Sequence, residues 1–352
     1  MKLIIFEIKK QLNNISFLMI IILFTIFAFT QLGEIFHYPV TSDNDIQYLL
    51  KNGERDYLFV SATEEEMTQN TIRYLQELMD RDDLPSNEEY INVVALLKEN
   101  SFEYVYNKMI DNESVIPWLN MCKAQFQMKI GSIEEINQNL INDLDDRGYS
   151  PILFEKNATY MQAIAAFLIF PIFLLLFTRD TRYNMSEIIY AQPITSTRYI
   201  INRYFGALIP LMLYLYLLGL TLNIISTWKF ISGGWNIEYS IFLKSFIIYI
   251  MPTIFFLSSL IMALILFFKK AVAVFPIYII YVIFNVTPGV FQNTGNLGIL
   301  FKAIIRLDGQ VIETQDIILN RVLYFTLALV LIGVSCKLYK KTSTILKKGI
   351  TI

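Results

Sequence analysis

The sequence predicts an all-α polytopic membrane protein with six transmembrane helices, and three observations lead to this fold class. The chain of 352 residues is 55% hydrophobic and has a mean hydropathy of +0.46, which is too apolar for an ordinary soluble protein. Several apolar runs are long enough to cross a bilayer core of about 30 Å. The charges are segregated, because residues 34–156 hold 24 acidic and 10 basic residues and the remainder holds 7 acidic and 19 basic ones. The chain is therefore an acidic polar domain joined to a membrane domain with basic flanks.

The first 32 residues predict an interfacial helix followed by the first span. In residues 1–14, apolar side chains alternate with Lys2, Lys9 and Lys10, a pattern typical of an amphipathic helix on the membrane surface. A plain basic flank is the alternative interpretation. The apolar run that follows is assigned to the first span, residues 15–32. It could also belong to a cleaved signal peptide, but the run is long and no small-residue cleavage site follows it.

Residues 33–158 are polar and are expected to form a mainly helical extracellular domain. Three capping boxes, each followed by an apolar pattern at helical spacing, predict helix starts at Thr63-x-x-Glu66, Ser86-x-x-Glu89 and Ser132-x-x-Glu135. Gly148 is expected to end the last of these helices. Strand patterns are scarce. The surplus of acidic side chains could attract a cationic ligand, or it could simply keep the surface solvated.

Residues 159–352 predict the five remaining spans. They are expected at residues 160–177, 204–225, 241–268, 271–287 and 322–336. Pro171, Pro252 and Pro276 fall inside three of these spans, where neighbouring helices can satisfy the freed carbonyl groups. The apolar stretch 297–305 is too short to cross the membrane and is expected to be a re-entrant or interfacial segment.

The distribution of Lys and Arg predicts that both termini are cytoplasmic. The N-terminus, the loop 178–203, the Lys269-Lys270 turn and the C-terminal tail together hold 14 Lys and Arg, against 5 in the two short outer segments. Short loops rich in Lys and Arg remain on the cytoplasmic side. The protein is therefore expected in the plasma membrane as a multi-pass protein, with residues 33–158 extracellular.

The loop 178–203 is the main candidate for a functional element. Met185, Ile188 and Ile189 recur at helical spacing, and Pro193 favours an end to that helix just before it. A helix lying across a cytoplasmic loop is a surface that a soluble partner can contact. Four arginines of the loop are expected to reach the lipid headgroups as boundary anchors: Arg179, Arg182, Arg198 and Arg203. A solvated loop with boundary arginines is the plainer alternative.

The sequence lacks the motifs of most catalytic and metal-binding classes. No glycine is followed by Lys and then Ser or Thr, which excludes a P-loop and nucleotide hydrolysis by this chain. The single histidine, His37, excludes multi-histidine metal sites. Cys122 and Cys336 are expected on opposite sides of the membrane, so no disulfide is expected between them. No catalytic residue, metal or cofactor is therefore assigned to the chain.

The spans themselves are expected to be almost free of charge. Lys244, near the outer end of the fourth span, is the one marginal case. Coupling to protons or sodium ions through buried carboxylates is therefore not expected, and any energy must come from a partner. Arginine–tyrosine pairs at the span boundaries are interpreted as interfacial anchors and not as a nucleic-acid surface.

The loop resembles the coupling-loop signature of the permeases of type-2 ABC exporters. The residues that carry the resemblance are Met185-Ser186-Glu187, Ala191-Gln192-Pro193-Ile194-Thr195-Ser196, Arg198, Ile201, Arg203 and Gly206. The N-terminal helix resembles the elbow helix of that family, and the insertion after the first span resembles the subgroup with an extracellular domain there. Asn320-Arg321 also resembles the residues before the last span of that subgroup. The resemblance covers the whole layout, but only the loop is a sequence motif.

The resemblance implies a permease subunit of an ATP-driven exporter. In this family a dimer of permeases, identical or not, sits on a dimer of soluble P-loop ATPases that bind the ATP, and the loop helix docks in a cleft of the ATPase. By the same resemblance, Glu187 and the turn of Pro193, Ile194, Thr195 and Ser196 form the docking element. The implied cargo is hydrophobic or peptide-like, and some relatives confer resistance to peptide antibiotics.

Two other functions are compatible with the sequence. One is a non-transporting receptor or sensor that binds a ligand through its acidic extracellular domain. The other is a polytopic membrane enzyme, which would need a polar constellation inside the spans that the sequence does not display. The helix-proline-turn pattern of the loop favours the transporter.

Overall fold

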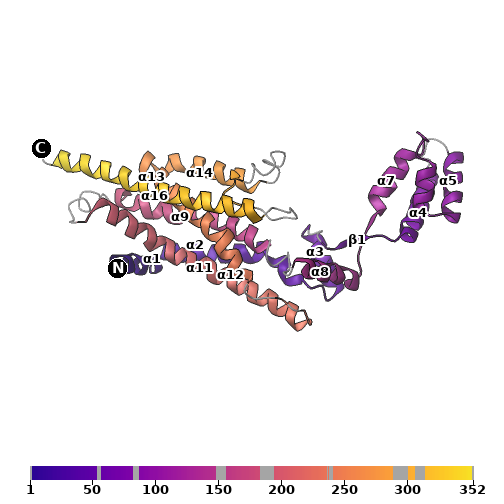
Figure 1. The fold of residues 1–352 in the computed structure, drawn as a ribbon, viewed down its shortest axis with the longest axis horizontal. Coiled ribbons are helices and arrows are strands. Elements are labelled where there is room, and N and C mark those ends of the chain that lie inside the picture. Colours follow the sequence, from indigo (N-terminus) through magenta and orange to yellow (C-terminus); the bar gives the residue numbers. More distant parts are fainter. Residues whose placement is uncertain are drawn as a thin grey trace. The chain divides into compact units, whose positions relative to one another are not determined.

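Two compact units make up the chain (Figure 1). In this computed structural model, the described residues are 2–53, 57–81, 87–147, 156–182, 194–235, 237, 241–287, 300–305 and 314–350. The bundle unit comprises Met1–Tyr38 and Leu144–Ile352, and the inserted unit comprises Pro39–Asp143. The inserted unit thus lies within the polar domain expected at residues 33–158, and it is shorter than that domain at both ends.

Long apolar helices dominate the bundle unit. Among the described residues, four are long and apolar enough to cross a membrane: α9 (Asn157–Arg182), α11 (Ser196–Ser232), the run Phe242–Phe268, and α16 (Thr314–Ile350). The helices α1 (Lys2–Leu12) and α2 (Ile15–Gln31) meet at 62° and together give a fifth candidate. The helix α14 (Ala271–Val286) is apolar but shorter. The pattern fits an all-α polytopic membrane protein, with four or five full-length candidates where the sequence predicts six spans.

Two of these helices extend beyond the predicted spans. The helix α11 begins at Ser196 and ends at Ser232, so it includes residues on both sides of 204–225 that were expected in loops. The helix α16 begins at Thr314, which places Arg321 inside a helix and not in an outer loop. Hydropathy marks the apolar part of a helix, whereas the helix itself continues through polar residues until a cap ends it.

The predicted fourth span contains a π-helical turn. The helix α12 (Ile241–Ser245) passes into η3 (Phe246–Ile250), which continues as α13 (Met251–Phe268). Pro252 lies in the first turn of α13, where a missing N–H is tolerated. The helix ends at Lys269, whose φ of 55° is left-handed and whose N–H donates to the Ile265 carbonyl at 2.9 Å. This geometry forms the tight turn predicted at Lys269-Lys270.

The bundle helices pack in pairs. The helix α13 lies along α16 and α9, and α11 lies along α1 and α16 (Figure 1). Aromatic contacts join several of these pairs, including Phe256 with Tyr324 at 4.7 Å and Phe173 with Tyr204 at 5.7 Å between ring centroids. Outward-facing apolar side chains such as Val272, 85% exposed, remain uncovered. An uncovered apolar surface of this kind suits contact with lipid.

The inserted unit is mainly helical, as predicted, with one small sheet. Its helices are α3 (Asp43–Lys51), α4 (Glu64–Asp80), α5 (Asn87–Glu99), α6 (Phe102–Lys108), α7 (Ile116–Phe126) and most of α8 (Ile133–Arg147). The strands β1 (Phe59–Ser61) and β2 (Met128–Ile130) pair antiparallel, with Val60 opposite Lys129. These strands were not predicted, because three residues are too few to show an alternating pattern. Ser86 and Gly148, expected to bound two helices, lie outside the described residues.

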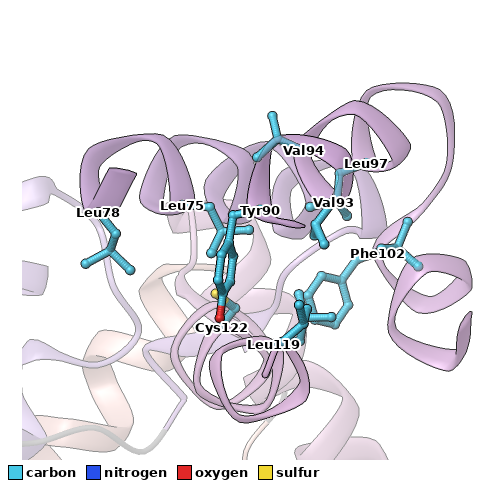
Figure 2. Close-up of a cluster of buried hydrophobic side chains, with 11 residues drawn as sticks. Leu75, Leu78, Tyr90, Val93, Val94, Leu97, Phe102, Leu119 and Cys122 are labelled. Atoms are coloured by element: carbon cyan, nitrogen blue, oxygen red, sulfur yellow. The ribbon is translucent and has the colours of Figure 1, made fainter. Parts of the chain in front are cut away.

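The inserted unit has a hydrophobic core of its own, shown in Figure 2. Four helices, α4 to α7, and the turn before α7 supply its buried residues: Leu75, Leu78, Tyr90, Val93, Val94, Leu97, Phe102, Val105, Val115, Leu119 and Cys122. The hydroxyl of Tyr90 donates to the Ser114 carbonyl at 2.7 Å, so this polar group is satisfied. Cys122 is a free thiol, and burial raises its pKa to about 12. It therefore packs as a small neutral side chain.

Two of the predicted capping boxes are confirmed, and one lysine joins them. The Thr63 N–H donates to Glu66 Oε2 at 2.9 Å, and the Glu66 N–H donates to Thr63 Oγ1 at 3.3 Å. The Ser132 N–H donates to Glu135 Oε2 at 2.8 Å, and the Glu135 N–H donates to Ser132 Oγ at 3.2 Å. Lys129 Nζ lies 2.7 Å from Glu66 Oε1 and 3.3 Å from Glu135 Oε1. A single cation of β2 therefore links the N-termini of α4 and α8.

The entry and exit segments of the inserted unit lie side by side. The Val40 N–H donates to Asn137 Oδ1 at 3.0 Å, and Asn137 Nδ2 donates to the Val40 carbonyl at 2.7 Å. Val40 lies just after the chain enters the unit, and Asn137 lies on α8, which leads out of it. One side chain therefore fixes the two crossing segments to each other.

Candidate functional site

The loop 178–203 is shorter than the sequence predicts. The helix α9 continues to Arg182, and α11 begins at Ser196. Glu187 and Pro193, two of the residues implied to dock on an ATPase, lie outside the described residues, as does the helix expected around them. The described part of the loop is therefore its base, where the two long helices end and begin.

The remaining docking residues lie at the start of α11. Ile194 is 37% exposed, Thr195 is exposed and Ser196 is the first helical residue. Thr195 Oγ1 accepts the N–H of Arg198 at 3.4 Å, so Thr195 is the N-cap of α11. The cap determines where the loop ends and leaves the Ile194 side chain accessible to a partner.

The four arginines expected at lipid headgroups occupy different environments. Arg179 and Arg198 are exposed, and neither forms an ion pair with a residue that the structure describes. Arg182 is the last residue of α9, and its side chain is outside the described part. Arg203 is only 4% exposed. Its surroundings are protein, so it is not positioned at the surface in the way the sequence suggested.

Arg203 joins α9 to α11 at the base of the loop. Its guanidinium donates to the Leu176 carbonyl of α9 and to the Tyr199 hydroxyl of α11. It also lies 5.8 Å from the ring centroid of Phe177 and 5.4 Å from that of Tyr199. Guanidinium groups combine such planar stacking with several directed N–H bonds. Tyr199 in turn stacks on Tyr339 of α16 at 5.2 Å, so three helices meet at this arginine.

The N-terminal helix α1 packs closely against the same part of α11. A Cβ atom at Gly206 would overlap the Cβ of Glu7, so only glycine lets the two helices approach this far. The chain then turns through 62° into α2, which Asn14 caps by accepting the Ser16 N–H at 3.1 Å. A helix, Lys2–Leu12, is therefore present in the region where an interfacial helix was expected, and it contacts the helix that leaves the loop.

A second candidate site, which the sequence did not predict, surrounds Arg321 inside the bundle unit. Arg321 is 5% exposed, and its Nη1 donates to Thr253 Oγ1 at 2.8 Å and to the carbonyls of Tyr249 and Ala303 at 3.2 Å. Its Nε and Nη2 have no hydrogen-bond partner in the part of the chain that the structure describes. The expectation that Lys244 is the one marginal charge of the spans is therefore wrong. Charges inside apolar helices are costly and often functional.

Gln162 of α9 is the second centre of this network. Its Oε1 lies 3.0 Å from Thr253 Oγ1 and accepts the Ile305 N–H at 3.2 Å. Its Nε2 donates to the carbonyls of Ala158 at 3.1 Å and Ile305 at 3.0 Å. Gln162 is fully buried and has partners for both ends of its amide. It therefore satisfies the irregular backbone of the segment 300–305.

Side chains of four elements hold the segment 300–305 among the helices. Besides Gln162 of α9 and Thr253 of α13, Asn285 Oδ1 of α14 accepts the Ala303 N–H at 2.7 Å, and Asn320 Nδ2 of α16 donates to the Lys302 carbonyl at 3.0 Å. Ala303, Ile304 and Ile305 are at most 2% exposed. Irregular backbone is tolerated among membrane helices where protein groups satisfy it. One signal could have revealed the site: isolated polar residues inside apolar helices usually face inward.

Comparison with known proteins identifies no relative. No family model, no curated protein and no solved structure matches the chain. The loop base and the Arg321 network are therefore interpreted from their own residues.

Proposed function

We propose that this chain is the membrane-spanning permease subunit of an ATP-driven type-2 ABC exporter. Arg203 carries this assignment, because it ties α9 and α11, the two helices on either side of residues 183–193, to each other. Because a long helix lies on each side of this segment, a soluble partner that moves the segment would also move both helices of the bundle. The close contact of α1 with α11 supports an elbow helix that moves with them.

In this proposal the chain lies in the plasma membrane with both termini cytoplasmic and residues 33–158 extracellular. Glu187 and Pro193 to Ser196 contact the ATPase, and Arg179, Arg182 and Arg198 lie near the headgroups. ATP is bound by the partner subunit and not by this chain. A second permease, the same chain or a sibling, completes the complex. The cargo is a hydrophobic or peptide-like molecule, which the complex exports or against which it gives resistance.

The test is purification of the tagged chain from its native membrane in mild detergent, followed by identification of the bound proteins. We expect a stoichiometric P-loop ATPase. Glu187→Gln and Pro193→Ala should reduce coupling between ATP hydrolysis and transport, and leave thermal unfolding unchanged. Lys270→Gln, an exposed charge outside the loop, is the matched control. Full ATPase binding and full transport in both loop variants would exclude the docking role.

A receptor function is the second candidate, and the separate core of the inserted unit is the observation that favours it. A unit with its own core and an acidic surplus can bind a cationic ligand without help from the bundle. Absence of any ATPase from a folded, purified chain would make this the leading function. The experiment is then a titration of the full chain with cationic peptides.

A further inference from the structure

The inserted unit consists of two parts that the chain joins at two points. Helices α4 to α7 pack on one another around the core of the unit, and among the described residues none of them lies along α3 or α8. The chain enters this four-helix part at Thr63, directly after β1, and leaves it at Gln127, directly before β2. The two strands are therefore the covalent connection between the four-helix part and the part that holds α3 and α8.

The two strands form a short ribbon and not a broad sheet. They pair over three residues each, and the sheet has two strands in the described part of the chain. At one end of the ribbon the Ala62 N–H donates to the Gln127 carbonyl at 2.9 Å, and at the other end the Gly131 N–H donates to the Leu58 carbonyl at 2.9 Å. Two-stranded ribbons twist more strongly than larger sheets and are only marginally stable by themselves. This ribbon can therefore bend or twist without disturbing the core of the four-helix part.

Lys129, in the middle of β2, contacts both parts at once. Its Nζ lies 2.7 Å from Glu66 Oε1 in the first turn of α4 and 3.3 Å from Glu135 Oε1 in the first turn of α8. Each carboxylate also accepts a backbone N–H at the start of its own helix, so each is fixed to its own part. All three side chains are partly exposed. Exposed ion pairs contribute little to stability and are screened by salt, so this bridge suits an orientation that can be released.

We propose that the ribbon of β1 and β2 is a hinge and that Lys129 is its latch. With Lys129 bonded to both carboxylates, the four-helix part keeps one orientation relative to α3 and α8. When the bridge opens, the ribbon alone joins the two parts, and the four-helix part rotates about it as a rigid body. High ionic strength opens the bridge by screening it. The device lies entirely inside the inserted unit, so it does not depend on whether an ATPase binds the chain.

Pulsed electron spin resonance on the full chain in mild detergent measures this orientation as a distance distribution. Spin labels are attached to cysteines introduced at the exposed Ala95 of α5 and the exposed Gln138 of α8, one in each part. The native Cys122 and Cys336 are buried, and the unsubstituted chain treated with the label controls for their reaction. We expect a single narrow maximum in low salt. Lys129→Met should lose that maximum, and so should the wild-type bridge in high salt.

Three controls separate a hinge from local unfolding. Lys129→Arg keeps a cation that can bond to two carboxylates, so it should keep the narrow maximum. Lys123→Met, which removes an exposed lysine of α7 that has no ion pair with a described residue, should keep it too. Labels at Ala95 and the exposed Ala124, both in the four-helix part, should give the same distance in every variant.

Three results would overturn the proposal. An equally narrow distribution in wild type and in Lys129→Met excludes the hinge, and an equally broad distribution in both excludes the latch. A broader distribution between Ala95 and Ala124 in Lys129→Met would show that the four-helix part itself unfolds. The salt series on the wild-type bridge needs no substitution at Lys129, so it decides between these results even where Lys129→Met does not fold.

Discussion

Arg321 Nη1 lies 2.8 Å from Thr253 Oγ1, so a cation of α16 is bound to a hydroxyl of α13 inside the bundle unit. The Ala303 carbonyl accepts from both side chains, at 3.2 Å from Arg321 Nη1 and 2.8 Å from Thr253 Oγ1. Both helices therefore bond to the same carbonyl group of the segment 300–305. This contact makes the position of that segment depend on both helices at once.

Replacing Arg321 by Met should loosen the segment 300–305. The change removes three hydrogen bonds from a charged donor, and bonds of this kind contribute about 1.5–3 kcal/mol each. We expect the amides of Ala303 and Ile305 to exchange about 10- to 100-fold faster in hydrogen-exchange mass spectrometry. Thr253→Val should act in the same direction. Lys244→Met, an exposed cation of α12, is the control, and equal protection in all three variants would contradict the role given to Arg321.

Replacing Gly206 by Ala should destabilise the contact between α1 and α11. The added methyl group overlaps the Glu7 side chain, and overpacking of this kind costs about 1–3 kcal/mol. Gly333→Ala on α16 is the matched control, because nothing lies within 4 Å of the added Cβ there. In that exposed helical position alanine should raise the free energy of unfolding by about 0.5–1 kcal/mol. Denaturant unfolding in micelles measures both, and equal effects of the two changes would disprove the close approach.

Replacing Arg203 by Met should separate the ends of α9 and α11. The Leu176 carbonyl and the Tyr199 hydroxyl lose their charged donor, for which we expect a loss of about 1–3 kcal/mol in the free energy of unfolding. Arg203→Lys should recover only part of it, because an ammonium group cannot stack on Phe177 and Tyr199 as a planar guanidinium does. The exposed Arg198, changed to Met, should cost less than about 0.5 kcal/mol. A larger effect at Arg198 than at Arg203 would be inconsistent with this structure.

Acid should weaken the inserted unit through Glu66. The hydrogen bond from Lys129, followed by that from the Thr63 N–H, lowers the pKa of Glu66 from 4.5 to about 2. Since the folded pKa is the lower one, the stabilisation is fully present above about pH 4.5 and is lost as the pH falls toward 2. The pKa of Lys129 is raised, chiefly by its hydrogen bond to Glu66. The stabilisation of the folded unit by Lys129 is therefore lost only as the pH rises above 10.5.

Glu66→Gln should therefore remove the part of the acid dependence that falls between pH 4.5 and 2. Trp118, which packs against the core of the inserted unit, reports unfolding once Trp228 and Trp235 are changed to Phe. Glu113→Gln, at an exposed carboxylate with no ion pair among the described residues, is the control. Identical pH profiles for wild type and Glu66→Gln would rule out the ion pair as the cause.

Local features of the fold could be predicted from the sequence, because the groups involved are neighbours in the chain. Thr63 and Glu66 are three residues apart, and their reciprocal hydrogen bonds follow from the helix geometry alone. The turn at Lys269-Lys270 likewise lies between two apolar runs. The positions of these elements follow from periodicity and capping, without any tertiary contact.

The candidate sites could be predicted only in part, because they depend on contacts between distant residues. Gln162 bonds to Ile305 across 143 positions, and no local pattern identifies that partner. Arg203 was expected in the loop, but it lies inside α11, and only packing against Leu176 decides that it faces inward. Arg321 lies beside an apolar run, and hydropathy alone assigned it to a loop. Charge patterns thus mark where an arginine is in the chain but not which groups surround it.

The amide pair between Val40 and Asn137 has a consequence for removal of the inserted unit. Because one side chain holds the entering and leaving segments together, the two ends of Pro39–Asp143 are adjacent. A domain whose ends are adjacent can be gained or lost by one insertion or deletion without tearing the host fold.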